Sequence, residues 1–169
     1  MHLRQVLMIK LLNNFDLTLE NIAATPECTI ESTRVVHFYR ELVFTAWTDP
    51  NHLINWWGPN GFTNTFYEFD LRPGGRWRYM MHGPDKGNYP NECEFITIEK
   101  PGLITWKRIS KPIFQVVASF EEISPQSTKI VFRMVFGTAE ECNKIKKHVV
   151  DKNEENFDRL ERELEKMKF

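Results

Sequence analysis

Residues 127–166, STKIVFRMVFGTAEECNKIKKHVVDKNEENFDRLERELEK, place an alternating apolar segment directly before a long amphipathic one. Apolar residues at every second position up to residue 137 predict a strand with one buried face. From Thr138 the period becomes helical, and Thr138 with Glu141 forms a capping-box pattern that predicts a helix start. The helix is expected over 138–166, with one stripe facing the core: Ile145, Val149, Asn153, Phe157, Leu160 and Leu164.

The chain before this unit predicts further strands and two short helices. A first strand is expected over 29–38, followed by helices over 41–48 and 51–57, because Asp49 and Pro50 end one helix and cap the next. Short connections between the later strands favour antiparallel pairing of neighbours. Turn sequences rich in Gly and Pro separate strands expected at 62–71, 76–83, 90–99, 103–109, 113–122 and 127–137.

This order predicts an α+β fold: a curved antiparallel sheet with two short helices and a long C-terminal helix. The long helix can bury its stripe only if it lies across the concave face of the sheet. The two short helices are expected to close one end of this arrangement. A cavity between the sheet and the long helix is a frequent result of such a geometry.

A chain of 169 residues is long enough to enclose one core. We assign residues 26–169 to a single domain and residues 1–25 to an N-terminal extension. Leu3, Val6 and Leu7 recur at helical spacing, so the extension is either a short amphipathic helix or a disordered segment.

Charge, hydropathy and cysteine content argue against nucleic-acid binding, a membrane span, disulfides and a zinc site. The formal net charge of -1 gives the chain no long-range attraction for nucleic acid. No segment approaches the roughly 18 consecutive apolar residues that a membrane span requires. Cys28, Cys93 and Cys142 are odd in number and widely spaced, which argues against a disulfide framework and a zinc site and predicts a cytoplasmic location. No cofactor or metal is expected.

Two segments resemble a known family. The runs LVFTAWTDPNHLINWWGPNGFTNTFYEFDLRPGGRWRYMMHGPDKGNYPNE (42–92) and AEECNKIKKHVVDKNEENFDRLERELEKM (139–167) resemble the heat-shock protein 90 (Hsp90) ATPase activator-like family. That family belongs to the SRPBCC superfamily, also called START/Bet v 1-like, so the resemblance implies the helix-grip fold over residues 29–168. It also implies a stand-alone domain of the stress-response or ligand-carrier kind, because the chain is too short for the additional N-terminal domain of the large eukaryotic co-chaperones.

Aromatic residues make up 13% of the chain, which fits either a densely packed core or an aromatic-lined pocket. In the strand at 76–83, alternation places Trp77, Tyr79 and Met81 on one face, which we expect to point inward. Only one of Trp56 and Trp57 is expected to face fully inward, because adjacent helix positions point about 100° apart. The residues predicted to line a ligand cavity are Trp56, Trp57, Phe66, Trp77, Tyr79, Met81, Phe95, Trp106, Arg108, Phe114, Met134 and Phe157.

Arg108 and His82 are the polar candidates. If Arg108 shares the face of Trp106, it is a buried cation that needs a carboxylate or a ligand oxyanion; the alternative is exposure at the strand end. His82 stands beside a predicted turn, where it either pairs with Glu92 or Glu94 as an acid–base unit or stabilises the turn through a hydrogen bond. No residue is assigned a catalytic role.

These observations predict a small apolar-ligand-binding or carrier domain, whose partner is a small apolar or lipid-like molecule. Two alternatives stay open. One is a stress-response protein that binds a chaperone partner, which only the resemblance implies. The other is a cyclase or hydrolase acting on a small molecule, which we do not favour because few polar groups converge on the predicted cavity.

Overall fold

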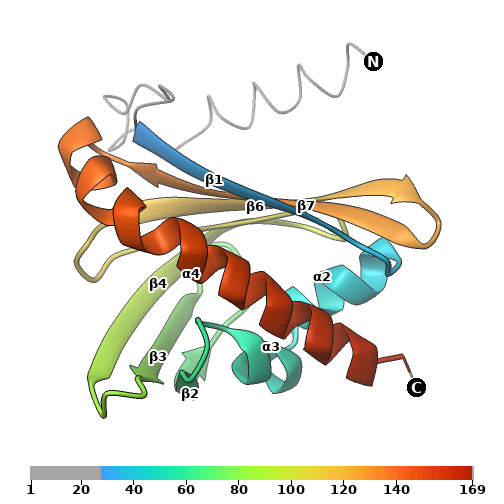
Figure 1. Cartoon of the computed structure of the whole chain (residues 1–169), viewed down its shortest axis with the longest axis horizontal. Helices are drawn as coiled ribbons and strands as arrows, with labels where there is room; N and C mark the ends of the chain where they lie inside the picture. The colour runs from blue at the N-terminus through green and yellow to red at the C-terminus, as the bar shows by residue number, and fades with distance from the viewer. Residues whose placement is uncertain (1–27, 169) are drawn as a thin grey trace.

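Strands and helices follow each other in the order expected from the sequence (Figure 1). The computed structural model describes residues 28–168, so the extension at 1–25 and the helix considered there lie outside the described residues. The described elements are β1 (Thr29–Val36), α2 (Arg40–Thr48), α3 (Pro50–Trp56), β2 (Thr63–Phe69), β3 (Arg76–His82), β4 (Asn88–Glu99), β5 (Leu103–Arg108), β6 (Phe114–Ser124), β7 (Ser127–Phe136) and α4 (Ala139–Lys166).

The described strands belong to one antiparallel sheet. Over residues 28–168 the sheet has seven strands in the order β1-β7-β6-β5-β4-β3-β2. From β2 to β7 each strand pairs with its neighbour in the chain, which confirms the pairing expected from the short turns. β1 pairs instead with β7, so the chain between β1 and β2 crosses from one edge of the sheet to the other. The short helices α2 and α3 lie in this crossing segment.

The strand bounds differ from expectation mainly at the hairpins. β4 begins at Asn88 because Asn88 pairs with His82 across the β3–β4 hairpin. β6 continues to Ser124, whose partner is Ser127, so the turn is shorter than the sequence suggested. Gly and Pro therefore located the turns correctly, but at these two hairpins backbone pairing extends closer to the turn than residue type alone indicates.

The concave face of the sheet packs against α4 (Figure 1). The helix begins as predicted, because the Thr138 hydroxyl accepts a hydrogen bond from the Glu141 amide at 3.2 Å. Phe157, Leu160 and Leu164 of the predicted stripe are buried, whereas its earlier residues are only partly so. The helix is thus packed deeply near its C-terminal end and less deeply along its middle. No helix within the described residues is long and apolar enough to cross a membrane.

Trp56 and Trp57 are both buried, so the prediction that only one faces inward was wrong. The helix α3 ends at Trp56, and Trp57 has an extended backbone with φ -62° and ψ 125°, so the helical spacing of 100° does not apply to the pair. Trp56 Nε1 donates to the carbonyl of Ala46 at 2.9 Å, and Trp57 Nε1 donates to the Tyr79 hydroxyl at 3.0 Å. Both rings therefore join α2 and α3 to the core.

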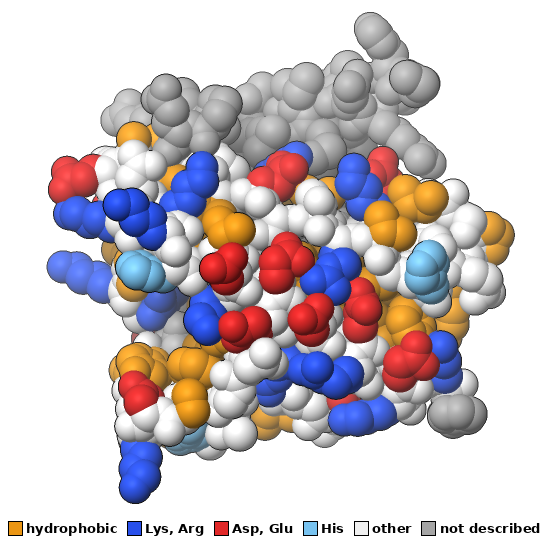
Figure 2. Space-filling model, in the orientation of Figure 1, with side chains coloured by type: hydrophobic (Ala, Val, Ile, Leu, Met, Phe, Trp, Pro, Cys, Tyr) orange, Lys and Arg blue, Asp and Glu red, His pale blue; other side chains and the backbone are white. Residues whose placement is uncertain are grey.

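Arg34 of β1 connects the sheet edge to the exposed side of α4. Its guanidinium forms ion pairs with Glu154 at 2.8 Å, and with Asp158 and Glu161 at 3.0 Å each. It also lies over the Phe157 ring at 5.6 Å. Figure 2 shows acidic and basic side chains intermixed on this face of the molecule. One cation thus offsets the repulsion among three carboxylates carried by the same helix.

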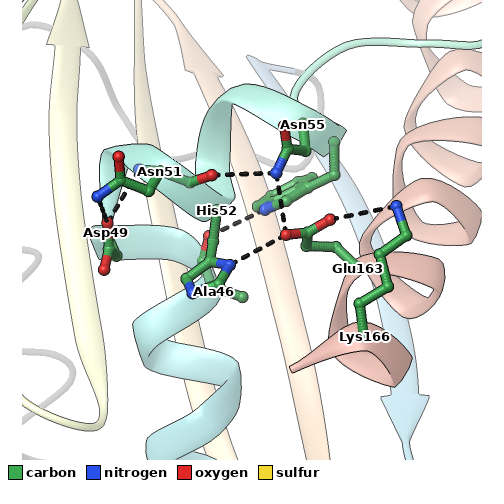
Figure 3. Close-up of polar contacts among 8 residues, drawn as sticks. Ala46, Asp49, Asn51, His52, Asn55, Glu163 and Lys166 are labelled. Carbon is green, nitrogen blue, oxygen red and sulfur yellow. Dashed lines mark hydrogen bonds and ion pairs between the residues drawn. The ribbon is translucent and has the colours of Figure 1, made fainter. Parts of the chain in front are cut away.

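Glu163 joins α4 to α3 through a buried carboxylate (Figure 3). Its Oε1 atom accepts hydrogen bonds from His52 Nδ1 and Asn55 Nδ2, both at 3.0 Å, and Lys166 lies 3.6 Å from its other oxygen. Burial opposes ionisation of Glu163, but the hydrogen bonds from His52 and Asn55 prevail and lower its pKa. The ionised form of Glu163 therefore holds the C-terminal end of α4 against the short helices.

We expect Arg34→Met to lower the free energy of unfolding by about 1–2 kcal/mol in low salt, because three carboxylates lose their shared cation. The loss should shrink in 1 M NaCl, where screening weakens surface ion pairs. Urea denaturation at both salt concentrations measures this effect. The control is Arg133→Met, which breaks a single pair with Glu31. Equal losses in the two variants would contradict a cooperative role for Arg34.

We expect Glu163→Gln to cost about 1–3 kcal/mol of stability at pH 7, because a buried hydrogen-bonded carboxylate is replaced by a weaker acceptor. Since the folded-state pKa of Glu163 lies below its usual value of 4.5, its ionisation stabilises the fold above that pH. The stability is lost as the pH falls through the lowered folded-state pKa. The difference between wild type and variant should therefore disappear in strong acid. Denaturation series across pH test this, with Glu165→Gln, an exposed neighbour paired with Lys168, as the control.

Candidate functional site

A pocket of about 350 Å³ lies between the inward face of the sheet and the middle of α4. Strands β3 to β7 form its floor, and the segment after α3 forms one side. Its apolar lining consists of Trp57, Gly58, Pro59, Phe62, Tyr79, Met81, Cys93, Trp106, Phe114, Val116, Phe132, Met134 and Val149. Its polar lining consists of Asn91, Arg108, His148, Lys152, Asn153 and Asn156.

The rim beside α3 is held by α4. Arg159 donates to the carbonyls of Gly58 and Pro59 at 2.7 and 2.8 Å, and Asn156 Oδ1 accepts from the Gly58 amide at 3.0 Å. Gly58 has a φ of 100°, a conformation that side chains disfavour, and a Cβ there would lie 2.6 Å from the methyl group of Met81. Glycine at this position therefore lets the backbone approach Met81 at the edge of the pocket.

An aromatic wall forms the end of the pocket nearest α3. The Tyr79 ring stacks on Trp77 with centroids 4.4 Å apart, and Trp57 packs edge-on against Trp106 at 5.8 Å. Burial, with a smaller effect of the Cys93 thiol, raises the pKa of Tyr79. The Tyr79 hydroxyl consequently keeps its proton near neutral pH.

Cys93 lines the same pocket as a protonated thiol. Burial raises its pKa to about 12, against the opposing effect of the nearby Arg108 charge. Since the thiolate is the reactive form of cysteine, this thiol is a poor nucleophile near neutral pH.

Arg108 lies on the same face as Trp106 and lines the pocket. Its Nε donates to the Ser110 hydroxyl at 3.1 Å, and its guanidinium lies over the Phe114 ring at 5.7 Å. Its side chain is half-buried, and it forms no ion pair with any carboxylate of residues 28–168. Of the two alternatives considered from the sequence, this geometry matches the cation within the pocket and not the exposed strand end.

The predicted cavity residues fall into two groups. One group lines the pocket: Trp57, Tyr79, Met81, Trp106, Arg108, Phe114 and Met134. The other group packs in or against the core beside it: Trp56, Phe66, Trp77, Phe95 and Phe157. The strand residues of both groups point toward the concave face, as their alternation predicted. Alternation alone could not separate them, because it reports the face of a strand and not how closely the opposing helix approaches.

Several lining residues were absent from the prediction. Val149 and Asn153 stood on the predicted helix stripe, and Phe132 belonged to the inward set of β7, so both patterns could have identified them. Phe62 and Asn91 carried no such signal. Their position depends on the segment after α3 and on the pairing of β4 with β3.

His82 does not pair with Glu92 or Glu94. Antiparallel register places Asn88 opposite His82, whereas Glu92 lies opposite Arg78. His82 Nδ1 lies 2.6 Å from Asn88 Oδ1, and its Nε2 lies 2.9 Å from the Thr65 hydroxyl. The acid–base hypothesis for His82 was therefore wrong, and hydrogen bonding beside the hairpin, the other interpretation, is what the structure contains.

Comparisons with solved structures identify the fold. A protein of Nitrosomonas europaea is 19% identical, with a TM-score of 0.77 over 85% of this chain and 98% of that one. A Rhodobacter sphaeroides protein is 19% identical, with a TM-score of 0.78 over 88% and 99% of the two chains. The AHSA1 protein of Silicibacter pomeroyi is 16% identical, with a TM-score of 0.67 over 80% and 96%.

No curated protein matches the sequence. The family described as activator of Hsp90 ATPase homolog 1-like protein matches residues 37–165. This match spans most of the described residues and agrees with the helix-grip arrangement of the sheet and α4. The chain therefore belongs to the activator of Hsp90 ATPase homolog 1-like family, within the SRPBCC superfamily.

Proposed function

We propose that this domain binds or carries a small apolar molecule in the pocket between the sheet and α4. The observation that carries the proposal is the pocket itself, about 350 Å³ in volume and lined largely by aromatic, aliphatic and thioether side chains. Its volume falls within the usual range for small-molecule sites, roughly 300–1,000 Å³. Met81 and Met134 on its walls suit a ligand of irregular shape, because their side chains adapt readily.

The energetics allow useful affinity. Burial of roughly 200 Å² of ligand carbon contributes about 5 kcal/mol at 25 cal/mol per Å², before the entropy of binding is subtracted. The bonds from Arg159 and Asn156 hold the rim in place without a ligand, which reduces the entropic cost of binding. A ligand of about a dozen heavy atoms fits, if each takes roughly the 30 Å³ of a water molecule.

A second candidate is a protein-binding role in the Hsp90 system. Membership of the family is the observation that favours it. The fully exposed side of α4, with its mixed charges, is the surface such a partner would contact (Figure 2). In a pull-down, capture of more of the host's own Hsp90 by wild type than by a charge-reversed α4 variant would support this role.

Three free thiols at Cys28, Cys93 and Cys142 suit the cytoplasm in which that chaperone acts.

A cyclase or hydrolase activity is the remaining alternative. Its polar candidates from the sequence do not converge, because His82 bonds to Thr65 and Asn88 while Arg108 lines the pocket. We therefore give the carrier role precedence over a catalytic one.

Blocking the pocket from the helix side tests the ligand-binding proposal. Val149 lines the pocket, whereas the adjacent Val150 is exposed and does not. We expect wild type to bind the neutral probes 2-naphthamide and decanamide with micromolar affinity in isothermal titration calorimetry. Val149→Trp should weaken binding at least ~10-fold by filling the pocket, and Val150→Trp should leave it unchanged.

Native mass spectrometry of freshly purified protein complements this measurement. We expect a non-covalent adduct that disappears on denaturation and is absent from Val149→Trp. A clean mass together with no binding of the neutral probes or of their carboxylic-acid counterparts would refute the carrier proposal and favour the protein-binding role.

A further inference from the structure

We propose that the ligand of this pocket is an apolar molecule bearing one carboxylate, or a comparable planar oxyanion, bound by the Arg108 guanidinium and the Tyr79 hydroxyl. The inference rests on the proposed function, because it names the ligand class of the same site. Three observations support it: the sign of the charges around the pocket, the unused donors of Arg108, and the unused proton of Tyr79.

The charges that line the pocket are of one sign. Among the described residues, no Asp or Glu lines it, whereas Arg108, His148 and Lys152 do. Lys152 is already paired with Glu155 at 2.9 Å, and His148 is exposed on α4. Arg108 is thus the permanent cation of the pocket that no carboxylate of residues 28–168 neutralises. A cation in a largely apolar pocket attracts an anionic ligand group more strongly than a cation fully surrounded by water does.

The guanidinium of Arg108 is oriented but not saturated. Its Nε atom is engaged by Ser110, and its plane is supported by the Phe114 ring. Its two terminal nitrogens have no hydrogen-bond acceptor among the described residues. These nitrogens carry donors in a fixed planar arrangement, which matches the two oxygens of a carboxylate. A contact of this kind fixes the position of the ligand head while the apolar walls hold its body.

Tyr79 supplies a second donor in the same pocket. Its hydroxyl oxygen accepts the hydrogen bond from Trp57, but its own proton has no acceptor among the described residues. Because the pKa of Tyr79 is raised by burial, the proton remains available for donation. A ligand oxygen is an acceptor that can satisfy it.

Each amide side chain of the lining already forms one hydrogen bond with the protein. Asn91 Nδ2 donates to the Tyr89 carbonyl at 2.9 Å, and Asn153 Nδ2 donates to the Ser32 hydroxyl at 3.1 Å. Asn156 accepts from the Gly58 backbone. Among the donors of the lining, Arg108 is the permanent cation that no carboxylate of residues 28–168 pairs with, which favours an acceptor-rich, anionic head over a neutral amide.

Matched acids and amides separate this inference from the proposed function. In calorimetry at pH 7.5 we compare 2-naphthoate with 2-naphthamide and decanoate with decanamide. On at least one of these two scaffolds we expect the acid to bind ~10–100-fold more tightly than the amide, because it forms charge-assisted hydrogen bonds. Binding of acid and amide with equal affinity would overturn the inference and leave the carrier function standing. Failure of both compounds on both scaffolds would overturn the two together.

Variants locate the preference at Arg108. Arg108→Gln should remove the preference for the acid while amide binding stays within ~2-fold, which also shows that the pocket is intact. Arg108→Lys should keep only part of the preference for the acid, because the ammonium lacks the planar donor pair. Tyr79→Phe should lower acid affinity ~5–20-fold.

The charge-matched control is Arg78→Gln. Arg78 is 55% exposed and faces Glu68 outside the pocket. An acid preference that survives in Arg108→Gln, or that falls equally in Arg78→Gln, would show that overall charge and not the Arg108 contact selects the ligand.

Discussion

The apolar stripe of α4 and the concave face of the sheet bury each other, and the position of every other element depends on that contact. Phe157, Leu160 and Leu164 are almost completely buried, so the helix cannot shift along the sheet without exposing them. The middle of the helix is packed less deeply. The pocket lies under this part, where Val149, Asn153 and Asn156 of α4 face the aromatic side chains of the sheet.

The two short helices give this arrangement a rigid end. They lie in the segment that crosses between the sheet edges, and their tryptophans form a continuous aromatic cluster with the sheet: Trp47, Trp56, Trp57, Trp77 and Trp106. The indole nitrogens of Trp56 and Trp57 donate hydrogen bonds inside the core, whereas those of Trp47 and Trp77 are buried without an acceptor among the described residues. The same cluster that stabilises this end also provides the aromatic wall of the pocket. Stability and binding thus share side chains here.

Charged groups follow a different distribution. Arg34 collects three carboxylates at the surface of α4, and Glu163 is satisfied by His52 and Asn55 where α4 meets α3. In both clusters, side chains of the protein itself pair with the charged group. Arg108 differs because its cation faces a largely apolar pocket and is met by a hydroxyl and a ring instead of a carboxylate. That contrast is why Arg108, among the charged residues of the domain, has the strongest claim to a ligand.

The sequence by itself determined the element order, the turns, the capped start of α4 and the inward face of each strand, because these depend on local periodicity and on Gly, Pro, Asp and Thr at particular positions. It also sufficed to place the chain in its family and to name Trp57, Tyr79, Trp106 and Arg108 as cavity candidates. Tertiary structure decided which inward residues line an open space and which fill the core. It also paired His82 with Asn88 and made both Trp56 and Trp57 buried. These outcomes depend on strand register and on how one helix crosses a curved sheet, and such long-range geometry leaves no periodic signal in the residues that it brings together.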